Sequence, residues 1–406
     1  MLKKILMIVL VFVSAHVTAQ SMTSSNSLCH AQIITVLSID GGGVKGIIPA
    51  TYLDQLEQAT HQKSAKLFDL LVGVSTGSII VSLLTTPDQN NQPKYSAKNL
   101  LHIYKQGAPI IFSASLYHKI KTLGGLIGPK YSSAGINQLA NQYYQNIEIG
   151  DLTNPLVVFG YDMRTKSIVP FCNWDGCKRA EKTDKIGDII VGTTAIMSYF
   201  ASKTIYNNKH QAVYQLNDTS FIMNNPAAIS YMYARNLCPN AKHYLILSLG
   251  TGRYSALINT PKEWGIIQWL STIVATTIEG DTTMANLTIS KIAKLVNKDT
   301  SKQSPEILFV RINPKLDSSD SDPVNASRKN IEKLQSVAMA DYAARHYLMS
   351  CLAKILVKKS FQGVDSNCIN ELESESNDFF NDYNAWPYIP LLSQKRENNH
   401  PIGMRF

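Results

Sequence analysis

The sequence predicts an α/β protein with a mostly parallel sheet that is covered by helices on both faces. Short apolar runs of strand length alternate with segments of helical periodicity along most of the chain. Two of these runs end in glycine-rich turns that lead directly into a helical segment. At 406 residues, the chain is long enough for one large α/β core with an additional segment.

Two strand–turn–helix units are predicted in the N-terminal part of the chain. The β-rich run over residues 32–38 leads to Asp40, and a helical pattern follows over residues 47–59. The apolar run over residues 70–72 precedes a small and aliphatic run over residues 78–84, which predicts a second helix. Further strands are predicted at residues 156–161, 167–171, 244–249 and 307–312.

The first 19 residues have the pattern of a secretory signal peptide. Lys3 and Lys4 precede an apolar core from Ile5 to Val13, and small residues follow up to Ala19. This core is too short to span a bilayer as a helix, although an uncleaved anchor is an alternative. Cleavage before Gln20 would give an exported chain, periplasmic or secreted, of bacterial type.

A polar segment divides the chain near its C-terminal end. Residues 315–328, which include the run Asp-Ser-Ser-Asp-Ser-Asp-Pro, have the composition of a linker. We therefore expect the main α/β domain over residues 20–314 and a helical extension over residues 329–406. Within that extension, an apolar stripe over residues 331–359 predicts one long helix.

The charge of the chain limits its partners. Removal of Lys3 and Lys4 with the signal peptide lowers the formal net charge from +9 to +7. A mildly basic exported protein is compatible with peripheral contact to an anionic membrane surface. Nucleic-acid binding is not predicted, because the sequence has no basic run with interleaved aromatic residues.

Six cysteines remain after the predicted cleavage, and an even number in an exported chain permits disulfides. Cys172 and Cys177 are the first predicted pair, since a bond between them would close a short loop. Cys351 and Cys368 are the second predicted pair, and free buried thiols are the alternative. No C-x-x-C pattern or close Cys/His set predicts a metal site.

Ser75 is the candidate nucleophile. It stands in the pattern G-x-S-x-G, formed by Gly73 to Gly77, between a predicted strand and a predicted helix. A serine in so tight a turn needs neighbours without a Cβ atom. Its hydroxyl is then presented at the carboxyl edge of the sheet, above a helix N-terminus. The pattern by itself is common, and its strand–turn–helix context makes it informative.

The glycine-rich turn from Gly41 to Gly46 allows two interpretations. The amides of Gly42 and Gly43 could form a nest for the negative charge that develops during acyl transfer. Alternatively, the turn matches G-x-G-x-x-G and could bind a dinucleotide, but Asp69 precedes the next strand instead of ending it. Lys45 could steady the loop, meet a lipid phosphate or simply be solvated.

A serine nucleophile needs a proton acceptor, and the sequence offers two kinds. In a conventional triad, a late histidine such as His346 or His400 would act. In a dyad, Asp218 could accept the proton directly. Asp218 ends a short predicted strand, and residues 224–226 (Asn-Asn-Pro) can cap and open a helix while pinning the Asp218 loop. Asp218 could equally be an ordinary turn residue.

An apolar segment over residues 109–126 contains isoleucine, leucine, phenylalanine and tyrosine residues. Three lysines, Lys119, Lys121 and Lys130, lie within it or beside it. This mixture predicts either an interfacial or lid element or an ordinary packing segment.

These motifs, in this order, resemble those of the patatin-like phospholipase family. Residues 40–46 (Asp-Gly-Gly-Gly-Val-Lys-Gly) are similar to the family's oxyanion signature, and residues 73–77 to its nucleophile elbow. Asp218 with residues 224–226 resembles its catalytic aspartate motif, and the similarity extends from about Ile33 to Pro314. The chain departs from the family at Thr219-Ser220, where two small residues are usual, and at Ser198, where proline is usual.

The resemblance implies a three-layer α/β/α fold and a lipid acyl hydrolase of the phospholipase A or lysophospholipase type. It implies no cofactor or metal, and a lipid or phospholipid substrate. The implied roles are Ser75 as nucleophile, Asp218 as base, Gly41, Gly42 and Gly43 as oxyanion donors, and Gly73, Gly77, Lys45, Asn224, Asn225 and Pro226 as supporting residues. An esterase with a Ser-His-Asp triad and a non-catalytic lipid-binding or storage protein are the alternatives.

Overall fold

The computed structural model describes Cys29 and residues 31–175, 177, 183–207, 209–254, 266–298, 304–317, 320 and 322–384. The predicted signal peptide lies outside these residues, as does the end of the predicted C-terminal extension after residue 384. No helix in the described part of the chain combines the length and the apolar character that a membrane span requires.

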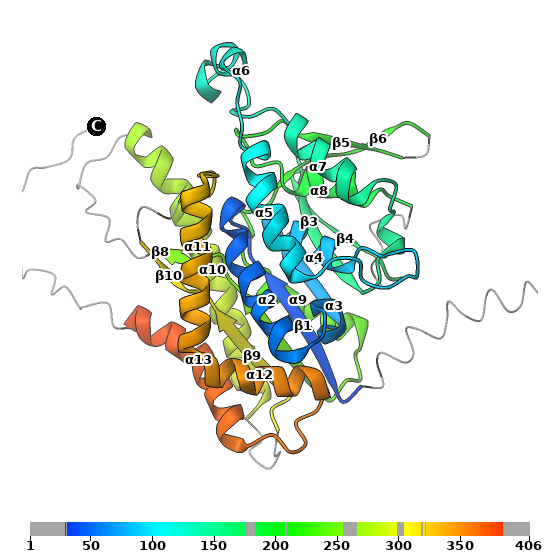
Figure 1. Ribbon diagram of the computed structural model, residues 1–406, viewed down its shortest axis with the longest axis vertical. Coiled ribbons are helices and arrows are strands. Elements are labelled where there is room, and N and C mark those ends of the chain that lie inside the picture. Colours follow the sequence, from blue (N-terminus) through cyan, green and yellow to red (C-terminus); the bar gives the residue numbers. More distant parts are fainter. Residues whose placement is uncertain are drawn as a thin grey trace, which may run out of the picture.

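A central sheet of eight strands organises the molecule (Figure 1). Its order is β5-β6-β3-β2-β1-β7-β9, and β4 pairs with β3 outside this path. The strands are β1 (Ile33–Ile39), β2 (Leu70–Val74), β3 (Leu156–Asp162), β4 (Ser167–Cys172), β5 (Lys203–Tyr206), β6 (Ala212–Asp218), β7 (His243–Leu249) and β9 (Ile307–Ile312). The five from β3 to β9 along this order are parallel, which confirms the predicted mostly parallel sheet.

Strand register brings the functional motifs to one edge of the sheet. Ile39 at the end of β1 pairs with Gly73 in β2 and with Leu249 in β7, so three strands end side by side. β6 runs antiparallel to β3, and its last residue, Asp218, pairs with Gly160. The chain after β6 therefore starts beside the turns that follow β1 and β2.

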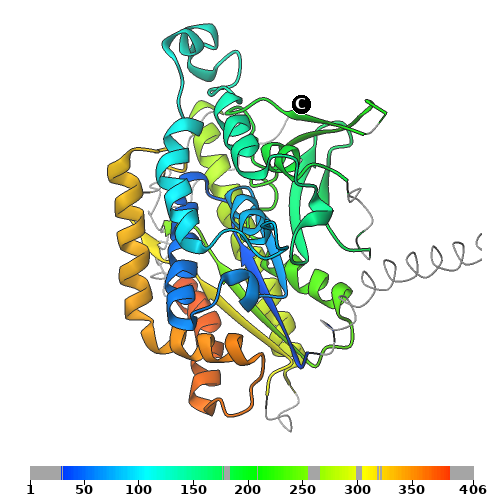
Figure 2. The ribbon, with the colours of Figure 1, turned by 45° about the vertical axis from the view of Figure 1, so that its right-hand side comes forward.

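Helices cover both faces of the sheet and give the three layers that the sequence predicts (Figures 1 and 2). Alternate side chains of β1 enter the two cores: Ile33 and Leu37 pack on one face, and Ile34 and Val36 on the other. The first layer contains α2 (Ile47–Thr60), α4 (Thr76–Thr85), α5 (Ala97–Ile111), α7 (Ala134–Tyr144), α8 (Ile186–Thr193), α11 (Arg328–Ala344) and α12 (His346–Lys358). The second contains α9 (Ala227–Leu237) and α10 (Ile266–Val296).

Short elements connect these layers. They are the 3₁₀ helices η1 (Gly43–Gly46), η2 (Leu123–Gly125) and η3 (Ile149–Asp151), the short helices α3 (Ser64–Leu67) and α6 (Leu116–Lys121), and a pair of two-residue strands, β8 (Arg253–Tyr254) and β10 (Lys315–Leu316). β10 begins the segment that the sequence predicts as a polar linker, and it pairs with β8.

The prediction of one long helix over residues 331–359 is wrong. The structure has two helices, α11 and α12, which are separated at Arg345 with φ −97° and ψ 19°. The Arg345 guanidinium bonds Asp341 at 2.6 Å and also contacts Glu375 of α13 (Ser366–Asn384). The helical pattern of the sequence continues across the break, and of these two partners only Glu375 belongs to another helix.

All six cysteines are paired. The predicted bonds Cys172–Cys177 and Cys351–Cys368 are confirmed. A third bond, Cys29–Cys238, joins the residues before β1 to the end of α9, with a Cα–Cα separation of 5.1 Å. Nothing in the sequence pairs these two cysteines, which are 209 positions apart.

Candidate active site

Ser75 lies at the junction of β2 and α4 in a strained backbone conformation. Its φ of 52° and ψ of −120° fall outside the regions that a side chain ordinarily allows. The Ser75 carbonyl accepts a hydrogen bond from the Ser78 amide at 2.8 Å, so the strained residue begins the first turn of α4. This is the sharp strand-to-helix turn that presents a nucleophile, as the G-x-S-x-G pattern predicts.

Close backbone packing explains the two glycines of the serine turn (residues 73–77). A Cβ atom on Gly73 would lie 2.4 Å from the carbonyl carbon of Gly77. A Cβ atom on Gly77 would lie 2.3 Å from the carbonyl oxygen of Ile39, at the end of the neighbouring strand. Both contacts are with backbone atoms, which cannot move aside as a side chain could.

The glycine-rich turn (residues 41–46) begins at a buried ion pair. Both guanidinium NH groups of Arg311 donate to the Asp40 carboxylate, at 2.9 and 2.6 Å, and Nη1 also donates to Ser248 Oγ at 2.8 Å. Burial raises the pKa of Asp40, and Arg311 opposes that rise. Arg311 is a charged residue in the otherwise apolar run Ile-Leu-Phe-Val-Arg-Ile, and that isolation was the sequence signal for a buried partner.

The three glycines of this turn differ in their hydrogen bonds. The Gly41 amide donates to the Asn224 carbonyl at 3.1 Å, and the Gly41 carbonyl accepts from Thr251 Oγ1 at 2.7 Å. The amides of Gly42 and Gly43 have no acceptor among the described residues. Two of the three predicted donors are therefore available to a ligand, whereas Gly41 is engaged within the protein.

Residues from the predicted linker hold the turn from outside. The Pro323 carbonyl accepts a hydrogen bond from the Val44 amide at 2.9 Å. Gly43 has a φ of 59°, and a Cβ atom there would lie 2.1 Å from the same carbonyl oxygen. The requirement for glycine at this position thus has both a conformational and a steric cause.

Lys45 is half-buried beside the glycine-rich turn. Burial lowers its pKa, and the negative charges of Glu279, Asp322 and Asp40 act in the opposite direction. No carboxylate in the described part of the chain lies within ion-pair distance of its ammonium group. Lys45 therefore lies near the site without a carboxylate partner among the described residues.

Asp218 is buried at the end of β6, close to Ser75. Its Oδ1 accepts hydrogen bonds from the Ser220 amide at 2.8 Å and the Ser220 hydroxyl at 2.7 Å. Its Oδ2 is buried and has no hydrogen-bond partner of ordinary geometry among the described residues. Burial raises the pKa of Asp218, and the nearby Ser75 hydroxyl and the Ser220 donors lower it. Ser75 and Asp218, 143 positions apart, are thus brought together.

Asn224 and Asn225 attach the loop after Asp218 to α10. Both backbone amides donate to Asp281 Oδ2, at 2.6 and 2.9 Å. The Asn225 side chain bonds Asn286 Oδ1 at 2.8 Å and accepts from the Ala227 amide at 2.9 Å, at the start of α9. Asn225 thus satisfies the amide of the first residue of α9, whereas the N-cap residue is Pro226 and no described side chain caps the helix there. Asp281 was not predicted, since nothing near it in the sequence marks it as a partner.

The two departures from the family pattern have local structural consequences. Ser198 has a φ of 68°, which proline cannot adopt, so the backbone here differs from one that carries a proline. Ser220 supplies a hydroxyl donor to Asp218 that glycine or alanine would lack. The serine at position 220 therefore bonds directly to the candidate base, Asp218.

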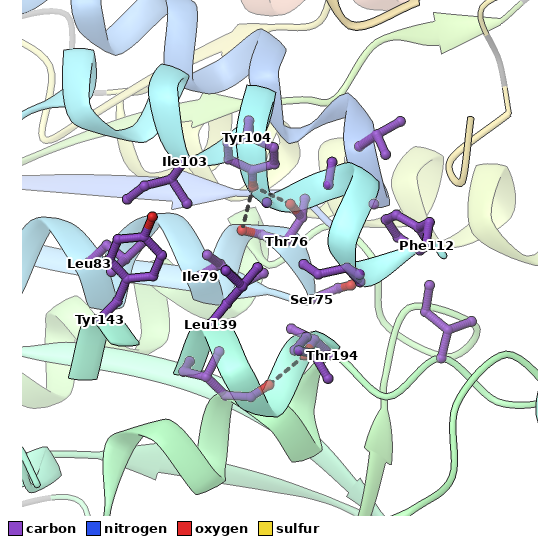
Figure 3. Close-up of a pocket in the computed structure, with 18 of the residues that line it drawn as sticks. Ser75, Thr76, Ile79, Leu83, Ile103, Tyr104, Phe112, Leu139, Tyr143 and Thr194 are labelled. Carbon is purple, nitrogen blue, oxygen red and sulfur yellow. Dashed lines mark hydrogen bonds between the residues drawn. The ribbon is translucent and has the colours of Figure 1, made fainter. Parts of the chain in front are cut away.

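An apolar pocket opens beside Ser75 (Figure 3). Ser75 and Phe112 lie toward one side of it in this view, and Leu83 and Tyr143 lie toward the other. The remaining wall comes mainly from aliphatic and aromatic side chains of α4, α5, α7 and α8. The Tyr104 hydroxyl bonds both the side chain and, at 3.3 Å, the carbonyl of Thr76, so α5 is tied to the serine turn.

The alternative interpretations find little support in the described residues. No histidine is among the residues that line this pocket, and His400 lies outside the described residues. Asp69 accepts hydrogen bonds from the amide and hydroxyl of Thr35, at 2.9 and 2.8 Å, and contacts Lys359. It lies at the start of β2, at the opposite edge from the glycine-rich turn, where it could not bind a nucleotide ribose.

Comparison with known proteins agrees with this arrangement. A family model described as patatin-like phospholipase matches residues 37–231, which include both turns and Asp218. Probable inactive patatin-3-Kuras 1 of Solanum tuberosum is 32% identical over 275 residues, covering 61% of this chain and 72% of that protein. Patatin group D-2 of the same species is 29% identical over 345 residues, covering 78% of this chain and 85% of that protein.

Among solved structures, human GIVD cytosolic phospholipase A2 matches with a TM-score of 0.41 and 8% identity, covering 80% of this chain and 63% of that one. The sequence relatives and the family model agree with the strand–turn–helix geometry around Ser75. This chain belongs to the patatin-like phospholipase family.

Proposed function

We propose that this protein is an exported lipid acyl hydrolase of the phospholipase A or lysophospholipase type, with Ser75 as nucleophile and Asp218 as base. Patatin-like phospholipases act on lipid substrates. The observation that carries the proposal is the meeting of a strained serine and a buried carboxylate beside an apolar pocket. An acyl chain requires such a pocket, and a serine hydroxyl requires such a base.

In the first step, Asp218 accepts the Ser75 proton while Ser75 Oγ attacks the ester carbonyl carbon. Oδ2 of Asp218 supports this role, because it is buried near the Ser75 hydroxyl and has no other hydrogen-bond partner among the described residues. Burial raises the carboxylate's pKa and so makes Asp218 a stronger proton acceptor than an exposed aspartate.

The tetrahedral intermediate carries a negative oxygen that needs preorganised donors. We assign this role to the amides of Gly42 and Gly43, which have no acceptor among the described residues. The amide of Thr76, the first residue of α4, is a further candidate because first-turn amides lack intrahelical partners. Each such donor contributes about 3 kcal/mol to transition-state stabilisation in a water-excluded site.

Collapse of the intermediate transfers the proton from Asp218 to the leaving alcohol, a lysolipid or a glycerol derivative. The acyl group then remains on Ser75, with its chain in the apolar pocket. Asp218 next takes a proton from a water molecule that attacks the acyl-enzyme carbonyl. When this second tetrahedral intermediate collapses, Asp218 returns the proton to Ser75 Oγ and the fatty acid is released. This cycle regenerates both residues.

Export to the periplasm or the exterior is part of the proposal. The signal-peptide pattern at residues 1–19 and the three disulfides support it, since disulfides persist in oxidising compartments. In such a compartment the substrate would be lipid presented at a membrane surface, to which the protein binds peripherally.

The test is fatty-acid release from phospholipid and lysophospholipid vesicles by the mature protein. We expect wild type to release fatty acid, and Ser75→Ala and Asp218→Asn each to lose at least about 10³-fold in rate. His346→Gln, at the start of α12, is the control that a triad would not tolerate. Circular dichroism first confirms that every variant folds.

Activity that survives Asp218→Asn but not His346→Gln would overturn the dyad. Stoichiometric lipid binding without turnover by wild type would instead support the non-catalytic alternative. A Ser75-linked acyl group, detected by mass spectrometry after rapid quenching, would identify the covalent intermediate directly.

A further inference from the structure

Residues 113–130, here called the projecting hairpin, stand out from the body of the protein. Figures 1 and 2 both show α6 beyond the other elements, at the end of the molecule toward which the parallel strands run. None of the α6 residues is buried. Six large apolar side chains of the hairpin are 57–86% exposed: Leu116, Tyr117, Ile120, Leu123, Leu126 and Ile127.

The projecting hairpin has a defined internal structure. The Thr122 hydroxyl donates to the His118 carbonyl at 2.9 Å, and the Thr122 carbonyl accepts from the amides of Gly125 and Ile127. His118 Nε2 lies 2.9 Å from the Pro129 carbonyl and closes the hairpin. Its apolar side chains are therefore held outward by ordered backbone. A contiguous apolar surface of this kind indicates an interaction site.

The hairpin and the sequence on either side of it carry charge of one sign. Between Asp88 and Glu148 the sequence has six lysines and no acidic residue. Two of these lysines, Lys119 and Lys121, are exposed on α6 itself, among the apolar side chains. Each lysine near an anionic membrane surface contributes about 1 kcal/mol of attraction. Exposed leucine, isoleucine and tyrosine mixed with lysine suit the interface of a bilayer.

The base of the hairpin is part of the pocket wall. Phe112 packs against Tyr131 and Phe200, with ring centroids 5.6 and 6.0 Å apart, and Phe112 and Phe200 both line the pocket. The Lys130 ammonium lies over the rings of Tyr131 and Tyr199, at 5.5 and 5.1 Å. A membrane that receives the hairpin is therefore brought to the side of the pocket where Phe112 lies.

We propose that the projecting hairpin inserts its apolar side chains into anionic bilayers and so places the pocket beside Ser75 at the lipid surface. The insertion itself is independent of catalysis, whereas delivery of lipid to Ser75 rests on the proposed function. The partner is a membrane and not a protein groove, because the exposed apolar residues and lysines are intermixed around a short helix.

Binding is tested with Ser75→Ala protein, which leaves the vesicles intact. Flotation with vesicles of phosphatidylcholine, alone or mixed with phosphatidylglycerol, should show at least about tenfold stronger binding to the anionic mixture. Leu116→Ser/Leu126→Ser/Ile127→Ser should reduce binding at least about tenfold, since burial of each side chain is lost. Lys119→Glu/Lys121→Glu should reduce binding to the anionic vesicles alone by a similar factor.

Matched controls lie elsewhere on the surface. Lys98→Glu/Lys105→Glu changes two exposed lysines of the same acid-free stretch on α5 and should have a smaller effect. Met232→Ser/Met339→Ser removes apolar side chains that are 62% and 49% exposed on α9 and α11, and should leave binding unchanged. Tyr117→Trp should show quenching by bromine-labelled acyl chains, whereas Tyr206→Trp, 60% exposed on β5, should not.

Two activity measurements separate this inference from the proposed function. In protein that retains Ser75, the hairpin variants should hydrolyse a soluble monomeric ester at the wild-type rate. They should hydrolyse vesicle lipid at least about tenfold more slowly than wild type. Loss of vesicle binding in these variants would support insertion even if no lipid were hydrolysed. Equal binding of wild type and both hairpin variants would overturn it, and would be expected if the hairpin served a protein partner.

Discussion

The glycine-rich turn and the serine turn follow adjacent parallel strands and lie side by side, yet they are held in different ways. The serine turn is held locally: Gly73 and Gly77 pack against each other and against the end of β1. The glycine-rich turn is held by remote side chains and carbonyls, from Arg311, Asn224, Thr251 and Pro323.

This difference shows which part of a catalytic edge a short motif can specify. The serine turn is constrained by contacts among its own residues, by the end of the adjacent strand β1 and by Tyr104 of α5, all of which lie within 40 positions of it. The glycine-rich turn permits several shapes, and partners 183 to 279 positions later select one of them. Five substitutions test this difference, and they are given in order of decreasing expected effect.

Arg311→Met should have the largest effect on stability. It leaves Asp40 buried without its cation, and breaking a buried pair in this way costs about 3–5 kcal/mol of unfolding free energy. Chemical denaturation measures the loss. The double variant Arg311→Met/Asp40→Leu removes both charges and should recover much of it. A single variant within about 1 kcal/mol of wild type would show that the remote ion pair does not hold the turn.

Gly77→Ala and Gly42→Ala should each lower the free energy of unfolding by about 1–3 kcal/mol or more. A second substitution should restore stability to Gly42→Ala but not to Gly77→Ala. A Cβ atom on Gly77 meets the Ile39 backbone carbonyl, which no substitution removes. A Cβ atom on Gly42 meets the Thr251 side chain, 2.2 Å from Oγ1. Thermal unfolding of Gly42→Ala/Thr251→Gly should therefore show partial recovery. If the double variant were no more stable than Gly42→Ala, the backbone, and not the Thr251 side chain, would be what excludes a Cβ atom at Gly42.

Ser75→Gly should stabilise the protein by about 1 kcal/mol while abolishing hydrolysis. Glycine relieves the strain of a φ of 52°, although it also increases the entropy of the unfolded chain. Ser75→Ala is the matched control, because it removes the hydroxyl and keeps the strain. Denaturation midpoints compare the two. If Ser75→Gly were the less stable variant, the serine turn would not be strained.

Ser220→Ala should have the smallest effect, a shift in pH dependence. The Ser220 hydroxyl donates to the ionised Asp218 carboxylate and lowers its pKa, so its removal raises that pKa further above the ordinary value. Since the base must be ionised, the acid limb of kcat/KM should move to higher pH, with little change on the plateau.

Initial rates on a soluble ester across pH measure this shift. Ser202→Ala removes a nearby hydroxyl that bonds Asn217 Oδ1 at 2.6 Å instead of Asp218, and should leave the limb in place. Movement of the Ser220→Ala limb to lower pH would contradict the assignment of Asp218 as the base.

Local patterns in the sequence determined much of this protein. Strand-length apolar runs gave the parallel sheet, because buried strands need side chains that suit both faces. The positions of Ser75, Asp218 and the glycine turns followed from turn chemistry and from the resemblance to the family. Adjacent parallel strands then place their carboxyl ends together. It was therefore also predictable that the glycine-rich turn and the serine turn lie side by side.

The tertiary structure decided what those turns bond to. It assigned the Gly41 amide to Asn224, the Asp40 carboxylate to Arg311 and the Asn224–Asn225 amides to Asp281. It also divided the last long helical pattern at Arg345. Periodicity and turn chemistry act over a few residues, whereas a buried ion pair or capped amide depends on which distant segments pack together. Only the folded chain supplies that information.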